Sequence, residues 1–196
     1  MPRDADTVTA DRETSQAMER VVVVGTSCSG KSTLARKLSQ VLGAPHVELD
    51  GIHWMPGWQL RPVDEVRRMV GEAAAAERWV MDGNYSAVRD IVWGRATAVV
   101  WLNYPFRVVL WRALSRTARR VVTREELFSG NREGFRQSFL SRDSIILWAI
   151  TSHGHVRRKY RRILDDGDFP HLRVIELHGP AEAEALVASL EAPLRY

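Results

Sequence analysis

A chain of 196 residues and 22.3 kDa is long enough for one domain with a substantial core and short for two. Hydrophobic residues at 45% and charged residues at 27% exclude a collagen-like, low-complexity or wholly disordered chain. The net charge of +4 is unevenly distributed, because residues 107–162 hold 14 basic and four acidic residues while the rest of the chain is net acidic. Such a basic region points to an anionic partner, either nucleotide phosphates or a nucleic-acid backbone.

Residues 1–19 are interpreted as a flexible tail, because they are rich in acids and lack the apolar centre of a secretory signal. No apolar run in the chain approaches the roughly 20 residues needed to cross a bilayer, so we expect no membrane span. The single cysteine, Cys28, excludes an internal disulfide and fits a reducing compartment. These features predict a cytoplasmic protein.

Strands alternate with helices along residues 20–196. Short apolar or β-branched runs predict strands at 20–24, 46–49, 79–81, 96–102 and 172–177. Helical spacing of apolar residues predicts helices at 32–42, 63–77, 105–120, 144–164 and 180–190. Residues 51–62 are rich in Gly, Pro and Trp and predict a loop, and the weakly periodic residues 121–143 predict a mobile lid insertion.

This alternation predicts a three-layer α/β fold of the P-loop NTPase type, with a five-stranded parallel sheet and a helical lid insertion. Residues 20–196 would form one such domain. In a sheet of this kind, ligands bind at the carboxyl ends of the strands.

The segment Gly25–Ser32 satisfies the phosphate-loop pattern G-x-x-x-x-G-K-[ST] between a predicted strand and a predicted helix. Backbone N–H groups and the positive helix N-terminus at such a loop cradle phosphates. Lys31 should reach the β and γ phosphates of ATP, and the Ser32 hydroxyl should ligate Mg²⁺. The expected nucleotide contacts are Gly25, Thr26, Ser27, Cys28, Ser29, Gly30, Lys31, Ser32 and Thr33, together with Arg112 and Arg116.

Two carboxylates, Asp50 and Asp82, each follow a predicted strand, at the edge where doubly wound sheets bind ligands. Asp82 fits an acid that holds Mg²⁺ directly or through water, and the alternative is a hairpin turn at Asp-Gly. Asp50 fits a residue that accepts the proton of an attacking hydroxyl or holds the phosphoryl acceptor. The alternative for Asp50 is an N-cap of a short following helix.

The acceptor region, residues 44–82, holds four arginines and seven acids. A weakly charged acceptor that carries a hydroxyl is therefore favoured, and Arg61 is the candidate ligand if the acceptor is a phosphate. Trp54 and Trp58 either stack on a base or sugar or pack within the protein.

Arg112 and Arg116 share one face of a predicted helix, because they are four residues apart. Guanidinium groups in this arrangement neutralise charge on a migrating phosphoryl group. The alternative is a solvated helix face. Arg132 and Arg136 repeat the spacing inside the predicted lid and would close over the nucleotide.

Several of these segments resemble the adenylate-kinase-like P-loop kinases, and more closely the small bacterial proteins often labelled DNA topology modulation proteins. The resemblance implies that Asp82 lies beside Mg²⁺ and that the arginine pair starts a lid helix and contacts ATP. Adenylate kinases follow the Asp-Gly pair with Phe-Pro-Arg, whereas this chain has Asn84 and Tyr85, so AMP is not the expected acceptor. The segments are Gly25–Ser32, Leu49-Asp50 with Trp54, Trp79–Tyr85, and Arg112 with Arg116.

These features predict an ATP-dependent phosphotransferase that uses ATP and Mg²⁺ and moves the γ-phosphate to a nucleoside, nucleotide or similar small molecule. An alternative is a regulatory or DNA-associated P-loop ATPase whose basic region binds nucleic acid. The expected catalytic residues are Lys31, Asp50, Asp82, Arg112 and Arg116, and the expected metal ligands are Ser32 and Asp82.

Overall fold

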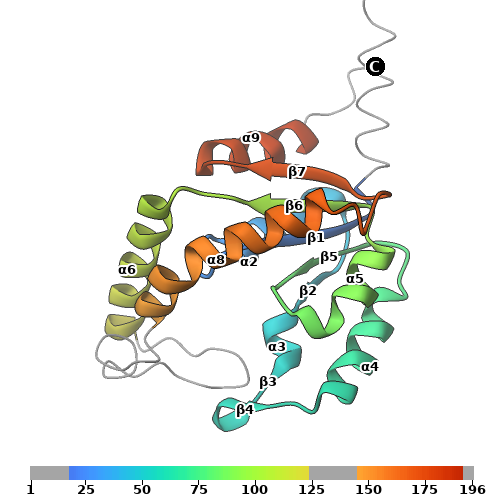
Figure 1. Cartoon of the computed structure of the whole chain (residues 1–196), viewed down its shortest axis with the longest axis horizontal. Helices are drawn as coiled ribbons and strands as arrows, with labels where there is room; N and C mark the ends of the chain where they lie inside the picture. The colour runs from blue at the N-terminus through green and yellow to red at the C-terminus, as the bar shows by residue number, and fades with distance from the viewer. Residues whose placement is uncertain (1–17, 124–144, 192–196) are drawn as a thin grey trace, which may run out of the picture.

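Five parallel strands form the sheet that positions the candidate site residues (Figure 1). The computed structural model describes residues 18–123 and 145–191. The predicted five-stranded parallel sheet is confirmed. In spatial order its strands are β2 (His46–Glu48), β5 (Trp79–Asp82), β1 (Arg20–Gly25), β6 (Ala98–Leu102) and β7 (Arg173–Leu177).

Helices cover both faces of this sheet, so alternate side chains of β1 enter two different cores. Val21 and Val23 face the core under α2 (Lys31–Leu42) and α9 (Pro180–Glu191). Val22 and Val24 face the core under α4 (Val63–Ala74), α5 (Arg89–Arg95) and α8 (Ile145–Asp165). Burial on both faces explains why the central strands are continuous apolar runs without alternation.

Helix α6 (Phe106–Thr123) follows β6 and lies against α8 at one end of the molecule (Figure 1). Its buried stripe includes Val109 and Ala113. The expected insertion at 121–143 begins too early, because α6 continues through Thr123; the remainder of that predicted lid lies outside the described residues. The two predicted lid arginines, Arg132 and Arg136, also lie outside the described residues.

The predicted loop at 51–62 contains short regular structure. It holds the end of α3 (Leu49–His53), the antiparallel pair β3 (Trp54–Met55) and β4 (Gln59–Leu60), and the 3-10 turn η1 (Pro56–Trp58) between them. Two-residue strands are too short to show an alternating pattern, which is why the sequence suggested only a loop.

Other boundaries also differ from the prediction. Helix α4 ends at Ala74 rather than residue 77, and β6 and β7 begin at Ala98 and Arg173. Helix α5, preceded by the 3-10 turn η2 (Ser86–Val88), was not expected, since seven residues cover only two turns. The predicted flexible tail, residues 1–19, extends too far, because the Met18 side chain is fully buried in the core. Residues 1–17 lie outside the described part of the chain.

Among the described residues, none of the helices combines the length and the apolar character that crossing a bilayer requires.

Candidate active site

The phosphate loop connects β1 to α2 at the carboxyl edge of the sheet. Cys28 and Gly30 have left-handed φ values of 63° and 95°. A Cβ atom on Gly25 would lie 2.8 Å from the Leu102 carbonyl oxygen, so a side chain there would clash with β6. No described side chain caps the N-terminus of α2, and its first turn holds no acid. The N–H groups that begin α2 are therefore left for an anion.

A cavity of about 650 Å³ opens above this loop and collects most of the predicted site residues. Gly25, Thr26, Ser29 and Asp82 do not line it. The side chains of Thr26, Ser29 and Asp82 are buried, so the two loop residues would act through their backbone only. The loop residues that line the cavity are Ser27, Cys28, Gly30, Lys31, Ser32 and Thr33, and Asp50, Arg112 and Arg116 line its other walls.

The Lys31 ammonium group lies between the phosphate loop and the carboxylates. Its Nζ donates to the Thr26 carbonyl oxygen at 3.2 Å. Burial lowers the pKa of Lys31, while the negative charges of Asp50 and Asp82 raise it and the Arg116 guanidinium lowers it. The charges of both predicted carboxylates and of one predicted arginine therefore affect the pKa of Lys31, as expected if these residues belong to one site.

Asp82 is the last residue of β5 and is 2% exposed. One carboxylate oxygen accepts a hydrogen bond from the Ser32 hydroxyl at 2.7 Å, and the other lies 2.7 Å from His46 Nε2. The hairpin alternative is excluded, because β5 is parallel to both neighbours and is followed by η2 and α5. The role of His46 was missed, since nothing in the sequence reveals the pairing of β2 with β5.

A hydroxyl and a carboxylate in contact form a donor set that suits Mg²⁺, which prefers oxygen ligands. Glu48 pairs with Asp82 in the β2–β5 register and also lines the cavity. No cluster of three or more His, Cys, Asp or Glu side chains suited to a metal occurs in residues 18–123 and 145–191. The Ser32 hydroxyl and the Asp82 carboxylate, 2.7 Å apart, fit an ion that keeps several waters and binds with a phosphate, as Mg²⁺ does.

Asp50 lies two residues beyond the end of β2, in the first turn of α3, rather than directly at a strand end. The N-cap alternative is wrong, because the N-cap of α3 is Glu48. Asp50 Oδ1 accepts a hydrogen bond of 2.5 Å from the Tyr85 hydroxyl. Burial and the neighbouring Asp50 charge raise the pKa of Tyr85, so this phenol stays protonated and keeps donating.

The predicted arginine pair faces the cavity. Arg112 Nη1 donates to the Ser29 carbonyl oxygen at 2.5 Å, and its guanidinium lies 5.3 Å from the centre of the Tyr104 ring. Arg116 lines the same cavity. The solvated-face alternative therefore does not hold for these two residues. They bring positive charge to the mouth of the phosphate loop.

Asn84 was not expected to contact the loop. Its Nδ2 donates to the Gly25 carbonyl oxygen at 2.5 Å, and the Gly25 N–H donates to its Oδ1 at 3.3 Å. The Tyr160 hydroxyl on α8 also donates to this Oδ1, at 2.8 Å. Only the position of Asn84 directly after the Asp-Gly pair hinted at a role.

Arg61 and the two tryptophans do not line the cavity. Arg61 donates to the Ile52 carbonyl oxygen and pairs with Glu65, so it closes the turn before α4. Trp54 packs edge-to-face against Trp58 and against His53. The packing interpretation of the tryptophans is the one that the structure supports.

No protein-family model and no curated protein matches the chain. Its structure is similar to shikimate kinase from Acinetobacter baumannii in complex with shikimate, with a TM-score of 0.52 and 16% identity over 90% of this chain and 94% of that one. Shikimate kinase from Aquifex aeolicus vf5 gives a TM-score of 0.49 and 17% identity over 87% of this chain and 92% of that one. A gluconokinase from Sinorhizobium meliloti 1021 gives 0.47 and 20%, over 90% and 91%. The likeness to the Acinetobacter enzyme confirms the predicted fold class: this chain has the α/β fold of the P-loop kinases.

Proposed function

We propose that this chain is an ATP-dependent phosphotransferase that moves the γ-phosphate of ATP to a hydroxyl group of a small molecule. The observation that carries the proposal is that the phosphate loop, the Arg112–Arg116 pair and the Asp50 carboxylate line one and the same cavity. A cavity with a phosphate cradle at one wall and a carboxylate at another suits transfer between two bound molecules.

The nucleotide side is built from main-chain and cationic donors. The N–H groups that begin α2 would bind phosphate oxygens, and Lys31 would hold the β and γ phosphates. Ser32 and Asp82 would hold Mg²⁺, which offsets negative charge on the phosphate oxygens when bound. Arg112 and Arg116 would stabilise the charge on the migrating group.

The acceptor side is built around Asp50. Its carboxylate would orient the acceptor hydroxyl and take its proton as the new oxygen–phosphorus bond forms and the bond from the γ-phosphorus to the β–γ bridging oxygen breaks. ADP leaves with the bridging oxygen. Because Tyr85 occupies Oδ1, the other carboxylate oxygen would receive the acceptor.

The choice of acceptors to test follows from the site. We favour nucleosides, nucleotides and sugars, and include shikimate because the Acinetobacter enzyme binds it. The segment Trp79–Tyr85 supports the closer likeness to the proteins labelled DNA topology modulation proteins. That label names no chemistry, so it does not choose among the acceptors.

The proposal is tested by measuring ADP release from ATP and Mg²⁺ in the presence of each acceptor, with Lys31→Ala as the control. One acceptor should stimulate ADP release in the native protein and not in the variant. Failure of native protein to bind ATP with Mg²⁺ in calorimetry would refute the proposal.

A second candidate is a DNA-associated ATPase. Exposed Arg157, Arg158 and Arg162 on α8 lie outside the cavity, in a surface hollow that Arg161, Asp165 and Asp166 also line, and arginines outnumber aspartates there. DNA binding through this surface would weaken steeply as salt rises. Gel shifts at two salt concentrations, with ADP release measured with and without DNA, separate the two functions.

A further inference from the structure

We propose that Tyr85 is a positioning residue for Asp50, and that Asn84 and Tyr85 together fix the phosphate loop and the acceptor carboxylate relative to each other. These two residues are called the bracket below. The inference deepens the proposed function and rests on it. It goes beyond the proposed function because it gives a positioning role to two residues that do not line the cavity.

The first arm of the bracket holds the phosphate loop. The Asn84 side-chain amide makes two hydrogen bonds with the backbone of Gly25, one from Nδ2 to the carbonyl oxygen and one from the Gly25 N–H to Oδ1. Two bonds to one residue fix the orientation of the amide as well as its position. The backbone of Gly25 also packs directly on Leu102, so the start of the loop is held from two sides.

The second arm holds Asp50. The Tyr85 hydroxyl donates to Asp50 Oδ1 at 2.5 Å, and its ring centre lies 4.3 Å from that of His53 on the same short helix as Asp50. The phenol is thus fixed by contacts on its ring and on its oxygen, which makes it a rigid donor.

The two arms are joined by one peptide bond, so they cannot move independently. Gly83, just before them, has φ of 147°, and a Cβ atom there would lie 2.9 Å from Leu49 Cβ. This close approach brings the end of β5 against the start of α3, where Asp50 lies. From the other side, Tyr160 on α8 donates to Asn84 Oδ1, which ties the bracket to a third element.

The bracket prevents a competing contact. Asp50 and Lys31 line the same cavity, and the Asp50 charge raises the pKa of Lys31, so a freely rotating carboxylate would turn toward that cation. A direct ion pair would occupy the lysine that must bind phosphate and the carboxylate that must bind the acceptor. Tyr85 holds Asp50 by one oxygen and so leaves the other oxygen and the lysine for the two substrates.

The first test uses the free protein and needs no acceptor. A hydroxyl proton bonded to a carboxylate should give a downfield proton resonance, assigned to Tyr85 by its loss in Tyr85→Phe. In Asp50→Asn this resonance should move upfield or vanish, because a neutral acceptor forms a weaker bond. Asp90→Asn is the matched control, since Asp90 is exposed and pairs with Arg67 instead; the resonance should be unchanged there.

The second test separates the two arms. Tyr85→Phe should keep the Kd for ATP with Mg²⁺ within about twofold and lower kcat/KM for the acceptor by about 10- to 100-fold. Asn84→Ala should instead weaken ATP binding about tenfold. Tyr160→Phe removes the hydroxyl that donates to Asn84 from the side of α8 and should leave the Tyr85 resonance in place. If no acceptor is turned over, slow hydrolysis of ATP by water replaces transfer as the readout.

Absence of the resonance from native protein, its survival in Asp50→Asn, or a native kcat/KM in Tyr85→Phe overturns the bracket. Failure of the native protein to bind ATP with Mg²⁺ refutes the proposed function instead, and the proton resonance then still decides whether Tyr85 holds Asp50.

Discussion

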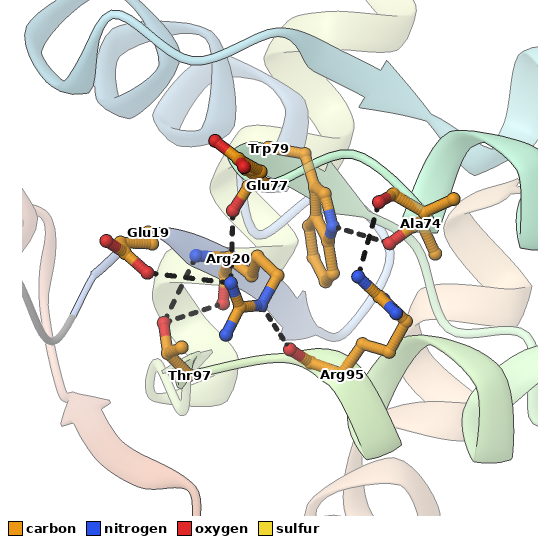
Figure 2. A network of polar contacts seen from close by, with 8 residues as sticks. Glu19, Arg20, Ala74, Glu77, Trp79, Arg95 and Thr97 are labelled. Atoms are coloured by element: carbon orange, nitrogen blue, oxygen red, sulfur yellow. Dashed lines mark hydrogen bonds and ion pairs between the residues drawn. The ribbon is translucent and has the colours of Figure 1, made fainter.

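The two edges of the central sheet use similar groups in opposite ways. At the amino edge, Arg20 Nε donates to the Arg95 carbonyl oxygen at 2.6 Å and its Nη1 donates to the Glu77 carbonyl oxygen at 3.1 Å (Figure 2). Thr97 Oγ1 accepts from the Arg20 N–H and donates to the Arg20 carbonyl oxygen. At the carboxyl edge, Arg112 binds one loop carbonyl oxygen and faces a cavity, above N–H groups that no described side chain caps.

This difference indicates that the polar groups at the amino edge stabilise the fold, whereas those at the carboxyl edge bind ligands. At the amino edge the Arg20 side chain donates to the last residue of α5, Arg95, and to Glu77 in the turn between α4 and β5, so its donors meet carbonyl oxygens of the protein itself. At the carboxyl edge Lys31, Arg112 and Asp50 are held by hydrogen bonds and also line the cavity, where a ligand can reach them. Substitutions at the first edge should cost stability, and substitutions at the second should cost activity.

The largest effect is expected for Lys31→Ala. The variant should lose phosphoryl transfer by a factor on the order of 10³ or more, because it removes the ammonium group of the phosphate loop that would bind the β and γ phosphates. Its thermal unfolding midpoint should stay at or above that of the native protein, since a partly desolvated ammonium group is removed. Transfer assays and calorimetry check this, and a fall in the midpoint by several degrees would contradict it.

Arg112→Ala should follow, with a loss of kcat of about 10²-fold and little change in the free energy of unfolding. Arg112→Lys should recover only part of the loss, since an ammonium group lacks the planar fork of donors. Arg107→Ala is the matched control, because Arg107 is exposed on the same helix. Equal kcat values in the Arg112→Ala and Arg107→Ala variants would place the charge stabilisation elsewhere.

At the amino edge, Arg20→Ala should lower the free energy of unfolding by about 1–3 kcal/mol and leave ATP binding unchanged. The physical reason is that two carbonyl oxygens lose their donor. Urea unfolding checks this against Arg68→Ala, whose pair with Glu72 is exposed and should contribute no more than about 0.5 kcal/mol. A loss of ATP affinity in Arg20→Ala would contradict the prediction that the amino edge contributes only to stability.

The smallest effect concerns pH. The pKa of Lys31 is lowered by burial, so its ammonium group loses its proton at a pH below that of an ordinary lysine. Binding of ATP should therefore weaken on the alkaline side at a lower pH than expected for a solvent-exposed lysine, and Lys31→Arg should remove this decline because arginine stays charged. Calorimetric titrations between pH 7 and about 10 measure it, and an identical decline in the arginine variant would assign it to another group.

Much of this architecture was predictable from local patterns. The Val21–Val24 run and the G-x-x-x-x-G-K-S segment could each be interpreted from a few consecutive residues, because a continuous apolar run predicts a buried strand and the loop pattern fixes its glycines and lysine. The placement of Asp82, Arg112 and Arg116 followed from strand ends and helical spacing. The short helix α5 and the hairpin after Asp50 were not predictable, since segments of two to seven residues are too short to show a period.

The sequence by itself determined that a phosphate loop lies between a buried strand and a helix at one edge of a parallel sheet. Only the tertiary structure decided which side chains hold that site in shape, namely His46 on Asp82, Asn84 on Gly25 and Tyr85 on Asp50. These partners are 35 to 59 residues apart in the chain. Their meeting depends on strand order and register, which are set by the packing of the whole sheet rather than by any local pattern.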